Sequence, residues 1–352
     1  ASDVYKRQVL SYFNGDWYID QMKRKVYESQ PLPFSLNKFN YRQGGMNDAL
    51  PYVENSQIKG SIDLNRYLEL VRKESRALQV NMSGGMTYNS IPSKSFYLDI
   101  NQETVLRSGI IPHNYHQYVP ERLKISWKGA YLEKSALMTL DLIATNNWER
   151  PIYFNMTSLN TIALEMKHMV LQEGQVYRLL PIEIDHGNAV NTEIMYTNLM
   201  DKWQFHDLGN EKIYYNHEDY QLRILQPTKS AYNTLSSALL NEGKREKAKK
   251  VVDFLYSNII KTNIDLDISL LSTTKLLFEL EEEGKAMALT DRLMKNANFQ
   301  LASLEQQEKV DSREGQIQLY LISQLSELVR EFGYDDLSKR CSDLLAQYVN
   351  FQ

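Results

Sequence analysis

A helical pattern fills the last third of the chain and limits its fold more than any other feature. From about residue 228 onward, apolar residues recur at the spacing of amphipathic helices. Gly243 and Gly284 each lie in a Glu-Gly-Lys turn between two such helices, about 40 residues apart, and Gly333 marks a similar turn. Helix pairs repeated in this way predict a tetratricopeptide-like α-helical domain over residues 227–352.

The first two thirds, residues 9–226, alternate between strand-like and helix-like segments. Strands are predicted at 9–13, 95–100, 122–127, 150–155 and 175–184, and helices from Asp16 and over 62–73, 132–147 and 191–204. The order strand, helix, strand across 122–155 is typical of a βαβ unit. We therefore predict an α/β domain over 9–226 that precedes the helical domain.

The composition argues against several classes of protein. A net charge of −4 offers no basic field for a phosphate backbone, so we expect no nucleic-acid partner. The single cysteine, Cys341, allows no disulfide within one chain and no cysteine metal site, and we expect a packed thiol. His113 and His116 lack a third ligand, so we expect no metal and no cofactor. No apolar run is long enough to span a bilayer.

The stretch GDWYID, residues 15–20, carries the first candidate ligand site. Asp16 and Asp20 are four residues apart, which puts both carboxylates on one helix face after the predicted strand 9–13. Ligands of open α/β sheets bind at such strand ends, and Trp17 and Tyr18 could stack on a sugar. The alternative is structural: Asp16 caps the helix and Asp20 serves its dipole, which accounts for both positions.

A second candidate region follows the predicted helix 132–147. Asn146 or Asn147 can end that helix in the left-handed conformation, Trp148 can cover the core, and Arg150 can pair with an acid. The same polar turn would suit a ligand pocket, although a helix end requires such residues anyway. Arg178 lies within an apolar strand, so it is either exposed at an edge or paired with an acid, and it could bind an anion.

Several segments together resemble one family: residues 15–29, 132–154, 173–182 and 190–203. They are similar to the C-terminal soluble portion of bacterial protein O-mannosyltransferase-like membrane proteins. In that family a multi-pass region like that of membrane glycosyltransferases precedes an α/β domain, and tetratricopeptide-like helices often follow. The resemblance implies a Rossmann-like sheet that lacks its first strand here. It also implies that the chain starts within a domain. Residues 1–8, ASDVYKRQ, resemble translated sequencing-adapter read-through, so we expect them not to be native sequence.

The resemblance implies an accessory domain on the periplasmic side of the bacterial inner membrane, attached through an N-terminal region absent from this chain. The α/β domain would bind an acceptor or glycan near Asp16, Trp17, Asn147 and Arg150. The helical repeats would bind a protein partner or acceptor polypeptide. No residue of this chain is expected to be catalytic, although the parent protein would be a glycosyltransferase.

Two other functions stay open from the sequence. The chain could be a stand-alone protein-interaction scaffold, in which the α/β part is only a spacer. It could also be a soluble glycoside hydrolase that uses Asp16 or Asp20 with a second carboxylate about 5–10 Å away. The sequence does not place that second acid.

Overall fold

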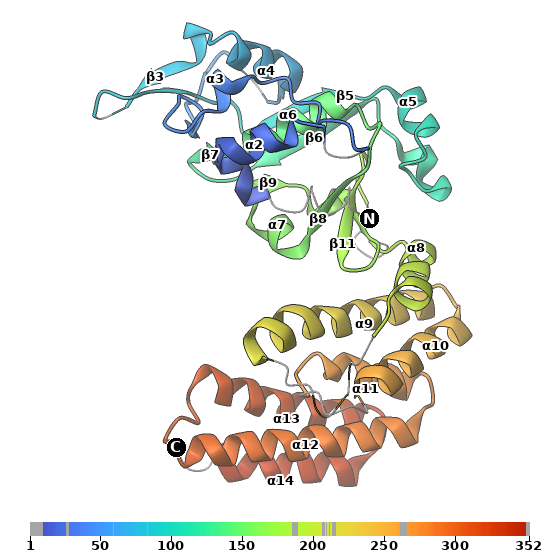
Figure 1. Cartoon of the computed structure of the whole chain (residues 1–352). Coiled ribbons are helices and arrows are strands. Elements are labelled where there is room, and N and C mark those ends of the chain that lie inside the picture. Colours follow the sequence, from blue (N-terminus) through green and yellow to red (C-terminus); the bar gives the residue numbers. More distant parts are fainter. Residues whose placement is uncertain are drawn as a thin grey trace. The chain divides into compact units, whose positions relative to one another are not determined.

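The computed structural model describes residues 10–25, 28–58, 60–82, 84–184, 189–205, 208, 210, 212, 216–260 and 266–349. The chain divides into two compact units, Ala1–Asn191 and Thr192–Gln352, each visible in Figure 1. The predicted domains divided the chain at residue 226, whereas the structural units divide it at residue 191. The predicted non-native segment, residues 1–8, lies outside the described residues.

The first unit combines short helices with small sheets. Its helices are η1 (Leu10–Asn14), α2 (Asp16–Met22), α3 (Lys38–Tyr41), α4 (Leu64–Arg72), η2 (Arg76–Leu78), α5 (Gln102–Arg107), η3 (His113–Tyr118), α6 (Lys134–Asn146), α7 (Met156–Thr161) and η4 (Lys167–Met169). Its strands are β1 (Ala49–Pro51), β2 (Ile62–Asp63), β3 (Gln79–Asn81), β4 (Thr87–Asn89), β5 (Ser95–Asp99), β6 (Arg122–Trp127), β7 (Tyr131–Glu133), β8 (Ile152–Asn155), β9 (Leu164–Glu165), β10 (Val170–Gln172) and β11 (Val176–Leu179).

These strands form separate, mostly antiparallel sheets. The largest has the order β2-β5-β6-β9, in which β2 runs parallel to β5 and the other pairs are antiparallel. An antiparallel sheet has the order β10-β11-β8, and two-stranded sheets join β1 to β7 and β3 to β4. Helix α6 is buried along almost its whole length, because its sequence is apolar on nearly every side.

Two sequence predictions for the first unit are wrong. The predicted βαβ unit does not form, because β6 and β8 flank α6 in sequence but belong to different sheets. Residues 10–13 of the predicted strand 9–13 lie in the 3₁₀-helix η1 instead. A short apolar run is compatible with either structure, and here Phe13 packs its ring edge-on against Phe34, with ring centroids 5.6 Å apart. The structure therefore does not confirm a Rossmann-like sheet.

The ends of α2 and α6 test the predicted caps. The N-cap of α2 is Gly15, and Asp16 is the first helical residue without a side-chain capping bond. The capping role predicted for Asp16 is therefore wrong, and Asp20 lies beyond the first turn of this short helix. Asn147 ends α6 in the left-handed conformation with φ 45°, as predicted. Trp148 is buried beside it, which confirms its predicted place over the core.

The second unit is entirely helical where it is described. It contains α8 (Thr192–Tyr196), the π-helical segments η6 (Thr197–Lys202), η7 (His217–Leu225) and η8 (Tyr256–Ile260), and the helices α9 (Gln226–Asn241), α10 (Arg245–Leu255), α11 (Leu270–Glu279), α12 (Glu283–Glu305), α13 (Arg313–Glu331) and α14 (Asp335–Val349). Helices α9 and α10, α11 and α12, and α13 and α14 pack pairwise as three hairpins. The predicted helical character is confirmed, and a tetratricopeptide identity is not.

All three hairpins turn through the same backbone motif. Gly243, Glu281 and Gly333 each have positive φ, of 74°, 62° and 85°. In each turn this residue and the next donate their N–H groups to carbonyls three and five residues earlier, which is the Schellman pattern. The predicted turn at Gly284 is wrong, because Gly284 lies inside α12 and Glu281 takes the left-handed position.

Glu281 is therefore the one residue with a side chain at the left-handed position of these three turns. Its backbone is strained there, because a Cβ disfavours positive φ. We expect Glu281→Gly to raise the free energy of unfolding by about 0.5–1 kcal/mol, because glycine adopts positive φ without a Cβ clash. The ion pair that is lost, to Arg245 at 3.0 Å, is exposed and contributes little. Urea denaturation measures the change.

Gly333→Ala is the matched control. A Cβ at Gly333 would meet no atom within 4 Å, so this substitution changes only the backbone preference. It should destabilise the protein by about 1 kcal/mol. A neutral or destabilising Glu281→Gly would contradict the assignment of the turn.

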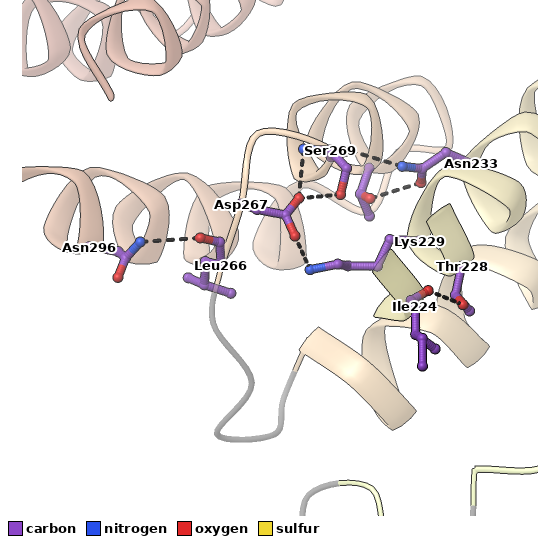
Figure 2. A network of polar contacts seen from close by, with 9 residues as sticks. Ile224, Thr228, Lys229, Asn233, Leu266, Asp267, Ser269 and Asn296 are labelled. Carbon is purple, nitrogen blue, oxygen red and sulfur yellow. Dashed lines mark hydrogen bonds and ion pairs between the residues drawn. The ribbon is translucent and has the colours of Figure 1, made fainter. Parts of the chain in front are cut away.

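A polar network fastens the first hairpin to the second (Figure 2). The ammonium of Lys229, on α9, is almost fully buried and donates to Asp267, whose carboxylate also accepts from the Ser269 backbone N–H at 2.8 Å. Asn233 donates to the Ser269 carbonyl at 3.0 Å and accepts from Thr273 at 2.8 Å. Side chains of α9 therefore fix the start of α11.

Candidate functional site

Helix α2 presents one polar and one apolar side. Successive residues are about 100° apart around a helix, so Asp16, Asp20 and Trp17 cover one arc. Ile19 and Met22 fall on the opposite side and are buried. The predicted placement of both carboxylates on one face is therefore confirmed. No strand precedes them in the described residues, so the sheet-edge argument for a ligand at this position does not apply.

The two carboxylates share one lysine. The Lys38 ammonium lies 3.7 Å from Asp16 Oδ2 and hydrogen-bonds Asp20 Oδ2. The buried Tyr41 hydroxyl donates to the other Asp20 oxygen at 2.8 Å. The hydrogen bond from Lys38, aided by the Tyr41 hydroxyl, holds the pKa of Asp20 below its usual range. Asp20 is thus an ionised hydrogen-bond acceptor near neutral pH.

Trp17 is the exposed aromatic residue of this surface. Its side chain is 59% exposed, and its ring centroid lies 6.1 Å from that of Tyr12, which is 51% exposed. A Cβ on Gly15 would lie 2.7 Å from the Trp17 indole nitrogen, so the glycine gives the ring room against the start of the helix. Tyr18 and Trp148, the other predicted aromatic candidates, are buried.

Asn147 and Arg150 lie at the C-terminal end of α6. Asn14, just before α2, accepts a hydrogen bond from the Ser135 N–H at the first turn of α6. Arg150 follows the last turn of α6 and donates to carbonyls of residues 30–31 at 3.2 and 3.1 Å. The next residue, Leu32, donates its N–H to the Met22 carbonyl at the end of α2 at 2.9 Å. Arg150 therefore fastens the loop that follows α2.

Arg178 is paired with an acid, one of the two alternatives that the sequence left open. Its guanidinium lies 2.5 Å from the Glu173 carboxylate, and both side chains are buried. The carboxylate also accepts from the Tyr153 hydroxyl at 3.1 Å and from the Asn191 amide at 2.8 Å. An arginine held in this way supports the β10-β11-β8 sheet and is not presented to a ligand.

A polar groove of about 450 Å³ lies along α4, and sequence reasoning missed it. Ser35 and Thr145 line it opposite α4, which contributes Asn65, Arg66, Glu69 and Arg72. Behind it, the buried Asp141 carboxylate accepts from the Ser35 N–H and hydroxyl and from the Leu36 N–H. The polar residues at i, i+1, i+4 and i+7 along α4, namely Asn65, Arg66, Glu69 and Arg72, were the available signal.

Comparison with known proteins gives one finding. The family model of TMEM260-associated domain 2 matches residues 3–199, more than half of the chain. The chain belongs to the TMEM260-associated domain 2 family. No curated protein and no solved structure matches it. This membership agrees with the membrane-protein family that the sequence resemblance implied. The mannosyltransferase-like activity of a parent protein is a separate proposal.

The ionisation of Asp20 limits the chemistry of the α2 surface. A glycosidase needs one carboxyl that keeps its proton near neutral pH, and Asp20 instead has a lowered pKa. Asp20 is therefore suited to accepting hydrogen bonds and not to acting as the general acid of a glycosidase. Across the described residues, no group of three potential ligands could hold a metal ion, and no helix is long and apolar enough to cross a membrane.

Proposed function

We propose that this chain is the extracytoplasmic accessory part of a glycosyltransferase-like membrane protein, and that its first unit binds a saccharide on the α2 surface. This surface consists of Asp16, Trp17, Asp20 and Lys38. The observation that carries the proposal is the exposed Trp17 ring beside two carboxylates and an ammonium group. Family membership supports the link to a membrane protein.

The chemistry of this surface matches a neutral, hydroxyl-rich ligand. A pyranose has an apolar face that packs on an indole ring and hydroxyl groups that donate to carboxylates. Asp16 and Asp20 are each about 70% covered, which leaves part of each carboxylate in contact with solvent. Lys38 balances one of their two charges and offers a donor to a sugar oxygen.

The second unit would provide the protein contact. Three stacked helical hairpins present broad helix faces, which is the kind of surface on which helical repeats bind a protein partner or acceptor polypeptide. We place both units on the periplasmic side of a bacterial inner membrane, attached through a region that precedes these residues. This placement rests on the resemblance of the sequence.

Trp17→Ala should weaken binding of a soluble α-mannose oligosaccharide about tenfold or more, because the stacking face is lost. The control is Tyr118→Ala, which removes an equally exposed ring (58%) elsewhere in the same unit. Gly15→Ala should also weaken binding, because the new methyl group displaces the indole. Isothermal titration calorimetry on the full chain measures all three variants. Equal affinities for wild type and Trp17→Ala would remove the proposal.

A further inference from the structure

The β3–β4 hairpin projects from the first unit. Its strands pair with each other and, in the described part of the chain, with no further strand. Figure 1 shows it reaching out beyond the remaining elements of its unit. The base is firmly held: Asn89 donates to Asn47 at 2.8 Å, and the Ser90 hydroxyl donates to the Leu78 carbonyl at 2.8 Å. The projecting end is therefore presented on a fixed support.

The projecting end exposes two flexible apolar side chains. Met82 is 45% exposed and Met86 is 58% exposed. Gly84 and Gly85 turn the chain between them with φ values of 101° and 78°, which only glycine adopts readily. The Met86 sulfur accepts from the Tyr88 hydroxyl at 3.5 Å, but about half of each methionine side chain on the projecting tip faces solvent. They indicate a contact with something outside the unit.

The charge around the hairpin is mostly positive. Residues 72–98 carry four cations, Arg72, Lys73, Arg76 and Lys94, and a single acid, Glu74, although the whole chain has a net charge of −4. Arg72 and Arg76 are both exposed at the base of the hairpin. A three-residue strand spans about 10 Å, so these cations lie within reach of a surface into which the tip inserts by a few ångströms.

We propose that this hairpin is a membrane-surface contact: Met82 and Met86 enter the interfacial layer of an anionic bilayer while Arg72 and Arg76 face its headgroups. Two methionines cover far less than the roughly 800 Å² per partner that a stable protein interface needs. A bilayer requires no shape complementarity, and apolar insertion combined with basic residues is how peripheral proteins bind it. The family's association with a membrane protein agrees with such a contact.

Vesicle flotation of the full chain tests the proposal, with vesicles of phosphatidylcholine containing 30% phosphatidylglycerol and with vesicles of phosphatidylcholine alone. The wild type should float with the anionic vesicles. Met82→Ser combined with Met86→Ser should lower the partition coefficient about tenfold, since two apolar anchors are lost. Arg76→Ala should lower it about fivefold. The control is Met156→Ser, at a similarly exposed methionine (47%) of the same unit, and should match the wild type.

Three results would overturn the proposal. They are no flotation of the wild type with anionic vesicles at low salt, equal flotation of the double variant, or an equal loss in the Met156→Ser control. Flotation that is independent of phosphatidylglycerol would remove the role of the arginines. None of these results bears on saccharide binding at α2, which the calorimetry measures separately.

Discussion

Arg178→Met is expected to lower the free energy of unfolding of the first unit by about 3–5 kcal/mol. The substitution leaves the Glu173 carboxylate, 2% exposed, buried without the guanidinium that lies 2.5 Å from it. Tyr153 and Asn191 still donate to it, but neutral donors compensate a buried charge only in part. Urea denaturation followed by tryptophan fluorescence measures the loss, because Trp127 and Trp148 are buried in this unit.

The control for this prediction is the double variant Arg178→Met, Glu173→Gln. It removes both charges, so it should be more stable than Arg178→Met alone by about 1–3 kcal/mol. The two substitutions would then show a clear coupling energy. Additive losses would mean that each side chain acts alone and that the ion pair does not support the sheet.

Asp141→Ala is expected to destabilise the first unit by about 3–4 kcal/mol. Asp141 is fully buried in α6 and accepts from the Ser35 hydroxyl at 2.5 Å and from the Ser35 and Leu36 N–H groups at 2.9 and 3.1 Å. Alanine leaves these donors without their acceptor, at a cost of about 1–3 kcal/mol for a buried group. It also frees the segment that forms one wall of the α4 groove. Denaturation measures the loss.

Asp141→Asn is the matched variant and should cost less than about 1 kcal/mol. Its amide oxygen can accept both backbone N–H groups, and its NH₂ can donate to the Ser35 hydroxyl. Burial raises the pKa of Asp141, although the hydrogen bonds from Ser35 and Leu36 oppose this shift. The folded protein then holds the proton more tightly than the unfolded chain. This group's contribution is complete below about pH 4 and declines as pH rises through the raised pKa, and Asn should abolish the decline.

Much of the local structure follows from the sequence because local signals are strong there. The alternation in 95–100 and 122–127 predicts β5 and β6, and the apolar run 132–147 predicts α6. Sheet membership depends on contacts between distant segments, so the βαβ expectation was wrong even though its three elements form. The turn was predicted at Gly284 because glycine favours positive φ. Glu281 adopts the left-handed conformation instead, which its own sequence preference does not predict.

The candidate site was predictable in part. Helical spacing places Asp16, Trp17 and Asp20 together, because one helix carries all three. The lysine that joins the two carboxylates comes from α3, in a stretch whose sequence gives no periodic signal, so Lys38 was missed. Arg150 binds carbonyls of residues 30–31, a contact between distant segments that no local sequence pattern predicts. Cys341 is buried, as the prediction of a packed thiol requires.

The measurement that tests saccharide binding at α2 most directly is an NMR titration of the four tryptophan indole N–H signals of the full chain, assigned by single Trp→Phe variants. Trp127 is buried with its indole N–H bonded to the Ser93 carbonyl, and Trp148 is also buried, so both are internal references. The account predicts that an α-mannose oligosaccharide shifts the Trp17 signal saturably and leaves Trp127 and Trp148 unmoved. A Trp17 signal that stays fixed at millimolar saccharide, or saturable shifts at Trp203 alone, would contradict it.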